Sequence, residues 1–224
     1  MKIIVFAPHP DDESYGVGGS IIKWIEEGHE VHIIWFTDGR AGYRKAKEEN
    51  ELEECEETSI TDEELAKIRL READVAGEYL GVTKENRHFL KIYDQELKNN
   101  VDFAVEKIRD IVIEANRFVI PSDNNGHPDH QATHDIAKKV AQKLNLVNLE
   151  FYVYNLYNPL KAQGENLIKN MIGNLRFKVY EALKIHKSQF YTKKMGWQVE
   201  VIKERRRERF GLYNLEDAGK YYNF

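Results

Sequence analysis

The N-terminal segment carries a strand–helix–strand pattern that limits the folds open to this chain. One apolar run covers residues 2–7, and a second covers residues 31–36. Between them, apolar residues recur at helical spacing around Ile21 and Trp24 and stop near Gly28. Strands without polar alternation are typical of a parallel sheet that is covered on both faces. Because parallel neighbours joined by a helix form a right-handed crossover, the pattern predicts a three-layer α/β fold.

The remaining sequence continues this alternation of helices and strands. Apolar stripes with a period near 3.6 residues predict helices, and short apolar runs predict strands. The expected helices cover 65–80, 101–112, 136–144 and 180–186, and the expected strands cover 89–92, 118–120 and 149–154. No linker, repeat or low-complexity tract interrupts the 224 residues. We therefore expect a single domain over 1–224, with a mostly parallel sheet and helices on both of its faces.

Composition argues against several classes of function. The formal net charge of -5 offers no basic face for nucleic acid. No apolar stretch approaches the ~20 residues that cross a bilayer, and the opening apolar run is too short for the core of a signal peptide. The only cysteine, Cys55, cannot form an internal disulfide and fits a reducing compartment. We expect a cytoplasmic protein with no nucleic-acid partner and no membrane partner.

Two polar clusters follow apolar strands that lie far apart in the sequence. The first cluster is 9–13, His-Pro-Asp-Asp-Glu, and the second is 127–130, His-Pro-Asp-His. Ligands collect at the carboxyl ends of parallel strands, so both clusters should open onto the same edge of the sheet. Either cluster alone could be a turn whose Asp caps the next helix. Two Asp, one His and one Glu within five residues are harder to explain as a cap, and they favour a functional site.

The residue types in the two clusters suit a catalytic zinc site. His9, Asp12 and His130 would provide two nitrogen ligands and one oxygen ligand, which leaves one position for water. Asp11 suits the role of a base for that water. An imidazole and a carboxylate able to orient it remain, on His127 and Asp129. The clusters therefore predict a zinc-dependent hydrolase.

The same residues resemble the motifs of the LmbE/PIG-L family of zinc-dependent N-acetylglucosaminyl deacetylases. Smaller matches extend the resemblance over most of the chain: Gly16, Gly18-Gly19, Thr37-Asp38-Gly39, Arg69, Glu72, Leu80-Gly81-Val82, Asp94, Leu97 and His186-Lys187-Ser188-Gln189. Pro8 and Tyr15 depart from the residues common beside the first motif. The resemblance implies a Rossmann-like α/β sheet and a metal-dependent N-deacetylase, a hydrolase of linear amide bonds.

The resemblance also implies roles for individual residues. His9, Asp12 and His130 are implied as the ligands of Zn²⁺, and Asp11 as the general base. His127 would stabilise the oxyanion, with Asp129 tuning it; the general acid could be Asp11 or His127. The expected partner is a small-molecule N-acetylated amino sugar, with N-acetylglucosamine joined to inositol, malate, another sugar or a larger aglycone. Family members often assemble, so a homo-oligomer is an expectation from the resemblance alone.

Other residues are open to two interpretations. Arg40 and Asp94 are candidate substrate-binding residues, although a surface Arg and a turn Asp explain them about as well. The charged segment 44–58 is best interpreted as a solvated helix or loop. Trp24 and Trp35 are expected in the core. Two further residues have no predicted role in the chemistry: His134 is expected on a helix surface, and Glu13 is expected only to support its loop.

Two rival functions fit the same residues. One is a zinc amidase or esterase acting on a substrate that is not a sugar. The other is a non-catalytic sugar- or metal-binding protein on the same scaffold. The presence of Asp11 argues against the second rival, because a binding protein needs no base beside its ligands.

Overall fold

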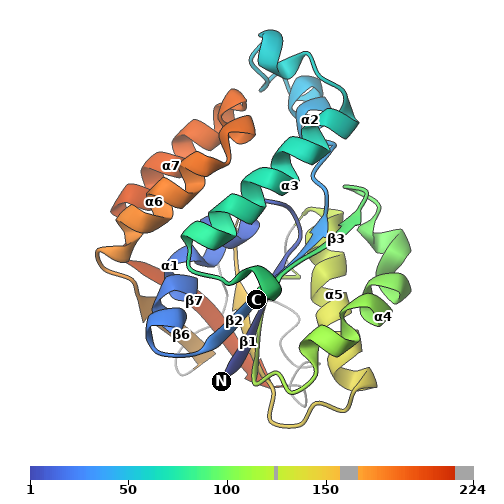
Figure 1. The fold of residues 1–224 in the computed structure, drawn as a ribbon, viewed down its shortest axis with the longest axis vertical. Coiled ribbons are helices and arrows are strands. Elements are labelled where there is room, and N and C mark those ends of the chain that lie inside the picture. The colour runs from blue at the N-terminus through green and yellow to red at the C-terminus, as the bar shows by residue number, and fades with distance from the viewer. Residues whose placement is uncertain (124–125, 157–165, 215–224) are drawn as a thin grey trace.

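The computed structural model describes residues 1–123, 126–156 and 166–214, apart from the side chains of 194–198 and 214. Within these residues, one seven-stranded sheet runs in the order β3-β2-β1-β4-β5-β7-β6 (Figure 1). The strands are β1 (Lys2–Ala7), β2 (Glu30–Thr37), β3 (Arg87–Ile92), β4 (Arg117–Pro121), β5 (Glu150–Tyr154), β6 (Leu167–Met171) and β7 (Arg207–Asn214). Strands β1 to β5 run parallel to one another, whereas β7 runs antiparallel to both β5 and β6.

Helices connect and cover the strands. They are α1 (Asp12–Glu26), α2 (Gly42–Glu48), α3 (Asp62–Tyr79), α4 (Val101–Val112), α5 (Pro128–Lys143), α6 (Leu175–Ile185) and α7 (Lys193–Glu204). Short 3₁₀ turns lie at η1 (Glu56–Thr58), η2 (Lys84–Asn86), η3 (Leu97–Asn100) and η5 (Lys187–Tyr191). Across the ranges that the structure describes, no helix is both long and apolar enough to span a bilayer.

The helices form a layer on each face of the sheet. Strand β1 illustrates the division, because Ile4 and Phe6 point to one apolar cluster and Ile3 and Val5 to the other. The first cluster includes residues of α4 and α5, and the second includes residues of α1, α3, α6 and α7. Figure 1 shows these two groups of helices on opposite sides of the strands. The prediction of a three-layer, mostly parallel α/β fold is confirmed.

The sequence did not reveal the far edge of the sheet, where β6 and β7 lie. In β7, Glu208 and Phe210 are buried. Because one of these inward positions holds a glutamate, the sequence lacks the alternation of apolar and polar residues by which a strand is predicted. The carboxylate of Glu208 accepts hydrogen bonds from the amides of Gly19 and Ser20, at 2.9 and 2.7 Å. The charged side chain is thus satisfied by the backbone of α1, a partner that local sequence does not indicate.

Candidate active site

The two polar clusters lie together at the carboxyl edge of the sheet. The first follows β1, and the second follows β4 and leads into α5. Strands β1 and β4 are parallel neighbours, so their carboxyl ends meet. His9 Nε2 lies 3.3 Å from Asp129 Oδ2, and His130 Nε2 lies 3.4 Å from Asp12 Oδ2. The structure brings the two clusters together, as the strand pattern predicted.

A tight turn after β1 orients the first cluster. The amides of Asp11 and Asp12 donate to the carbonyl oxygen of His9, at 3.0 and 3.3 Å. The amide of His9 in turn donates to Asp12 Oδ2 at 2.9 Å. The same oxygen lies 3.1 Å from His9 Nδ1. Asp12 Oδ2 is therefore held between the imidazoles of His9 and His130.

The cluster has the donor atoms of a metal site. There are two overlapping sets of residues whose donor atoms all lie within 4.8 Å of one another. One set is His9, His127 and His130; the other is His9, Asp94, His127 and Asp129. Two ligands of a tetrahedral zinc are roughly 3.3 Å apart, and Asp12 Oδ2 lies 3.1 and 3.4 Å from its two imidazole neighbours. Imidazole nitrogen and carboxylate oxygen are also the donors that such a metal prefers. The side chains present fit a divalent metal ion.

Burial and charge together shift the pKa values in the cluster. Burial lowers the pKa of His9, but nearby carboxylates, led by that of Asp94, outweigh burial and raise it well above its usual value. Burial raises the pKa of Asp12, yet the charges of His130 and His9 outweigh it and lower the pKa to about 2. Burial lowers the pKa of His130 to about 4. An ionised Asp12 and a neutral His130 are the protonation states that metal binding requires.

Arg69 and Gly39 fix the position of Asp11. The guanidinium of Arg69 is buried, with Nη2 3.1 Å from Asp11 Oδ2 and Nη1 donating to the Gly39 carbonyl oxygen at 2.8 Å. Gly39 has a φ of +67°, and a Cβ atom there would overlap the guanidinium of Arg69. Only glycine combines that conformation with that close approach. Burial raises the pKa of Asp11, while the charge of Arg69 opposes the rise.

His127 caps the N-terminus of α5. The hydrogen bond that its ring accepts identifies which ring nitrogen carries the proton. The amide of Asp129 donates to His127 Nδ1 at 3.2 Å. A neutral imidazole that accepts at Nδ1 has its N–H at Nε2. Burial, followed by the charge of His9, lowers the pKa of His127 and keeps its ring neutral near pH 7. His127 is therefore a hydrogen-bond donor at the edge of the cavity.

Asp129 is buried and fastens the loop after β3 to the site. Its carboxylate accepts hydrogen bonds from the amides of Gln95, at 2.7 Å, and Leu97, at 3.2 Å. Its contact with His9 Nε2 adds a third attachment. The same loop carries Asp94, whose Oδ1 lies 3.3 Å from His9 Nε2 and whose Oδ2 accepts from the amide of Ala41 at 3.2 Å.

A second, deeper network supports the first cluster. Glu13 is fully buried and accepts hydrogen bonds from Trp35 Nε1 and Ser14 Oγ, each at 2.7 Å. His186 Nε2 lies 3.4 Å from the same carboxylate. Glu13 thus ties the start of α1 to β2 and to the end of α6, which agrees with the supporting role expected for it. Trp24 and Trp35 are buried in the core, as predicted.

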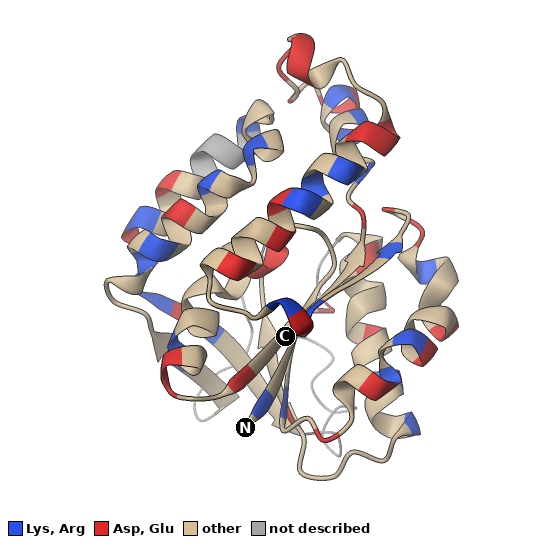
Figure 2. Ribbon diagram, in the orientation of Figure 1, with Lys and Arg blue, Asp and Glu red and all other residues tan. Residues whose placement is uncertain are grey.

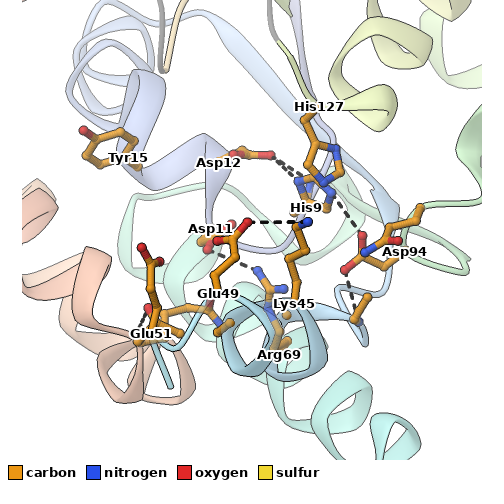
Figure 3. A pocket seen from close by; sticks show the side chains of 16 residues that line it. His9, Asp11, Asp12, Tyr15, Lys45, Glu49, Glu51, Arg69, Asp94 and His127 are labelled. Carbon is orange, nitrogen blue, oxygen red and sulfur yellow. Dashed lines mark hydrogen bonds and ion pairs between the residues drawn. The ribbon is translucent and has the colours of Figure 1, made fainter. Parts of the chain in front are cut away.

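A cavity of about 480 Å³ opens beside the cluster (Figure 3). Its lining consists of His9, Asp11, Asp12, Tyr15, Ala41, Gly42, Lys45, Ala46, Glu49, Glu51, Arg69, Asp94, Gln95, His127, Gln189 and Thr192. Of the two candidate substrate-binding residues, only Asp94 is in this lining. Arg40 instead pairs with Asp38 Oδ2 at 2.8 Å, contacts Glu63 Oε1 at 3.1 Å and stacks on the ring of Tyr93.

Sequence reasoning missed much of the cavity wall. The segment 44–58 is a short helix followed by a largely exposed loop, as expected, but the sequence did not indicate that Lys45, Glu49 and Glu51 line the cavity. Arg69 is part of the family resemblance, but the sequence analysis predicted no function for it. Its position indicates burial, since it lies four residues from Leu65 and from Ala73 on the buried stripe of α3.

The surface position expected for His134 is wrong. Its side chain is buried, and Nδ1 lies 2.9 Å from the carbonyl oxygen of Pro121. Burial lowers the pKa of His134 to about 4. The ring satisfies the end of β4 and is absent from the donor sets around His9.

The fold and the site together define a metal-dependent hydrolase built on a three-layer α/β sheet. The profile of a family described as "PIG-L: GlcNAc-PI de-N-acetylase" matches residues 4–141. The chain belongs to this family. The resemblance noted in the sequence is confirmed, and with it the expected enzyme class, a hydrolase of amide C–N bonds.

Individual relatives agree with this membership. A probable N-acetyl-alpha-D-glucosaminyl L-malate deacetylase 2 of Bacillus anthracis is 28% identical over 231 residues, covering 97% of each chain. A diacetylchitobiose deacetylase of Thermococcus kodakarensis is 32% identical over 134 residues, which is 58% of this chain and 45% of that protein. The solved N,N'-diacetylchitobiose deacetylase of Pyrococcus horikoshii shares the fold, with a TM-score of 0.74 at 22% identity over 97% of this chain and 85% of the other.

Proposed function

We propose that this chain is a zinc-dependent N-deacetylase that removes the acetyl group from an N-acetylglucosamine unit of a small molecule or glycoconjugate. The observation that carries the proposal is the position of Asp11, which faces the same cavity as the cluster of imidazoles and carboxylates. Membership of a de-N-acetylase family and the names of the relatives support the choice of substrate. The proposal treats residues 1–224 as one LmbE-like domain, an assumption supported by the pairing of β7 with β5.

His9, Asp12 and His130 are the proposed ligands of the zinc ion. The separations of 3.1 and 3.4 Å around Asp12 Oδ2 support the inclusion of Asp12, and His9 and His130 belong together to one of the two donor sets. When bound, zinc supplies Lewis-acid chemistry, which polarises the acetyl carbonyl and makes water acidic near neutral pH.

Asp11 is the proposed general base. Arg69 contacts Oδ2 of this carboxylate, which leaves the other oxygen for the proton of the attacking water. As the C–N bond breaks, the same carboxyl group can return that proton to the departing amine. Asp11 rather than His127 is the proposed acid, because a neutral imidazole lacks the extra proton.

His127 is the proposed donor to the acetyl oxygen. Its Nε2–H can bond to the negative charge that develops there, an effect worth roughly 3 kcal/mol per donor in other hydrolases. The charge of Asp129 raises the pKa of His127 and so tempers the effect of burial. Asp94 is the proposed contact for sugar hydroxyls, whereas Arg40 is assigned to holding the loop that carries Asp38.

Release of acetate tests the proposal. Purified protein is stripped with a chelator, dialysed and assayed on N,N'-diacetylchitobiose and N-acetylglucosaminyl malate, before and after addition of zinc. We expect activity only with metal present. Full activity in the stripped protein would refute the metal dependence, and a lack of acetate from every N-acetylated amino sugar would refute the proposed substrate class.

A further inference from the structure

The element at 186–189 is part of the family resemblance, but its last residue has no part in the proposed chemistry. His186 follows α6, and the next residues form the 3₁₀ turn η5. His186 contacts Glu13 inside the protein, whereas Gln189 is half-buried and lines the cavity. The element thus reaches from the core to the cavity, and Gln189 is the residue through which it can contact a bound molecule.

Ser188, the residue before Gln189, is held by α2 and α3. Its amide donates to Glu72 Oε1 at 2.9 Å, and its hydroxyl donates to Glu72 Oε2 at 2.6 Å. Its carbonyl oxygen accepts from the hydroxyl of Tyr43 at 2.9 Å. Ser188 and Tyr43 are both buried. These hydrogen bonds fix Ser188, and with it the backbone from which the Gln189 side chain extends.

The hydroxyl of Ser188 also determines how the side-chain amide of Gln189 is oriented. Gln189 Nε2 donates to Ser188 Oγ at 3.1 Å. A serine hydroxyl has one proton, and Ser188 gives it to the carboxylate of Glu72, so Ser188 Oγ can only accept. The atom of Gln189 that faces it must therefore be the nitrogen. Among the described residues, no further hydrogen bond engages Oε1 or the second N–H of this amide.

Helix α3 relates Gln189 to the proposed base. Acidic and basic residues follow one another along this helix, as Figure 2 shows, and Arg69 and Glu72 are neighbours on one face because they lie three residues apart. Arg69 contacts Asp11, whereas Glu72 holds Ser188. Three residues advance a helix by roughly 4.5 Å. The element that carries Gln189 is therefore attached about one helical turn from the residue that orients Asp11.

Backbone contacts join the end of η5 to the segment after α2. Leu52 and Thr192 form an isolated antiparallel bridge. Hydrogen bonds from amide to carbonyl oxygen lie on both sides of this bridge, and each is 2.9 Å long; they run from Glu53 to Tyr191 and from Lys193 to Glu51. The end of η5 is thus fixed beside Glu51.

This attachment indicates which part of a substrate Gln189 faces. The carbonyl oxygen of Gln189 accepts from the amide of Thr192 at 3.0 Å, so Gln189 lies one 3₁₀ turn from the bridge. Figure 3 shows Glu51 on the side of the cavity away from Asp94 and His127. Asp94 is the proposed contact for hydroxyls of the N-acetylglucosamine unit. A residue on the other side of the cavity therefore faces the unit to which N-acetylglucosamine is joined.

We propose that Gln189 is a specificity-determining residue whose side-chain amide binds hydroxyl groups of the unit joined to N-acetylglucosamine. This inference rests on the proposed function and deepens it. Oε1 accepts from one hydroxyl, and the second N–H donates to its neighbour, so the amide matches adjacent hydroxyls of a second sugar. Ser188 and Glu72 are positioning residues, because they determine which atoms of the amide face the substrate.

A comparison of two substrates that differ by one sugar tests the inference. The metal-loaded protein is assayed for acetate release from N,N'-diacetylchitobiose and from N-acetylglucosamine, which lacks the second unit. Gln189→Ala should lower kcat/KM for the disaccharide by about tenfold, mainly through KM, because one or two hydrogen bonds are lost. The value for the monosaccharide should change by less than about twofold. A loss confined to the larger substrate cannot come from misfolding, which lowers both values.

Ser188→Ala tests the positioning of the amide. This variant keeps Gln189 but removes the acceptor of its Nε2–H, so KM for the disaccharide should rise by about threefold. Lys187→Ala is the matched control. Lys187 is an exposed residue of the same 3₁₀ turn, it lies outside the cavity lining, and its removal should change the kinetics of neither substrate.

The outcomes separate this inference from the proposed function. If acetate is released and Gln189→Ala affects both substrates equally, affects neither, or is matched by Lys187→Ala, the inference is overturned and the deacetylase is left intact. Acetate release from other N-acetylated amino sugars but not from the disaccharide would do the same. Acetate release from no N-acetylated amino sugar would overturn the proposed function, and the inference with it.

Discussion

The inner end and the outer wall of the cavity are built on different principles. At the inner end, His9, Asp12 and Asp129 are buried, and hydrogen bonds hold their side chains at the ends of parallel strands. The outer wall is formed by α2 and the segment after it, where Lys45 and Glu49 remain exposed to solvent. Desolvated charges act strongly on one another, whereas exposed charges are screened by water and salt. The charges of the inner end can therefore act strongly on a reacting group, whereas those of the outer wall are weakened by water and salt.

The largest difference between the two ends should appear when the proposed base is removed. Asp11→Asn keeps the shape of the side chain but cannot accept the proton, so kcat should fall by roughly 10²–10⁴-fold. Metal content, measured by atomic spectroscopy, should stay near one ion per chain. Turnover within twofold of the wild type would eliminate Asp11 as the base.

Lowering the pH should reduce the free energy of unfolding through His134, a buried residue that is not part of the proposed chemistry. The pKa of His134 is lowered from 6.5 to about 4 in the folded chain, so its stabilising contribution is present above pH 6.5 and is lost as the pH falls towards 4. The free energy of unfolding should fall by about 3 kcal/mol through this group. His134→Asn should remove this pH-dependent loss, while its side-chain amide can still donate to the carbonyl oxygen of Pro121. Urea unfolding at pH 7.5 and pH 4.5 measures both values. An unchanged pH dependence in the variant would show that His134 is not responsible.

Activity should be sensitive to the addition of one methyl group at Gly39, beside Arg69. Gly39→Ala would push Arg69 away from Asp11, and we expect kcat to fall by roughly 10–100-fold because the base loses its orientation. Gly28→Ala is the matched control. Gly28 also has a positive φ, of +81°, but a Cβ atom there meets nothing within 4 Å. Equal losses of activity in both variants would mean that backbone strain, rather than displacement of Arg69, is the cause.

The sequence predicted the inner end well because that end depends on local patterns. The motifs at 9–13 and 127–130 follow apolar strands, and parallel topology then requires their ends to meet. The strand positions of β1 to β5 followed from the same apolar runs. The role of Arg69 could not be predicted, because its partner Asp11 lies 58 positions away in the sequence and only the fold brings the two side chains together.

The outer wall and the far edge of the sheet depend on contacts that local patterns do not contain. The segment 44–58 resembles a solvated surface, and it becomes a wall through pairing with residues 191–193. Strand β7 was hidden by Glu208, whose partners are backbone amides of α1. In both cases, hydrogen bonds to distant parts of the chain determine the path of a charged segment, and local sequence does not indicate those partners.

The bridge between Leu52 and Thr192 has a consequence for how this enzyme can diverge. The attachments of the wall at Glu51, Glu53 and Lys193 run from amide to carbonyl, and every residue except proline can supply them. Side chains at positions 49 and 51 can therefore be exchanged in evolution or in the laboratory while the segment keeps its path. The backbone thus holds the outer wall and side chains hold the inner end, so a substitution should disturb the path of the inner end more than that of the wall.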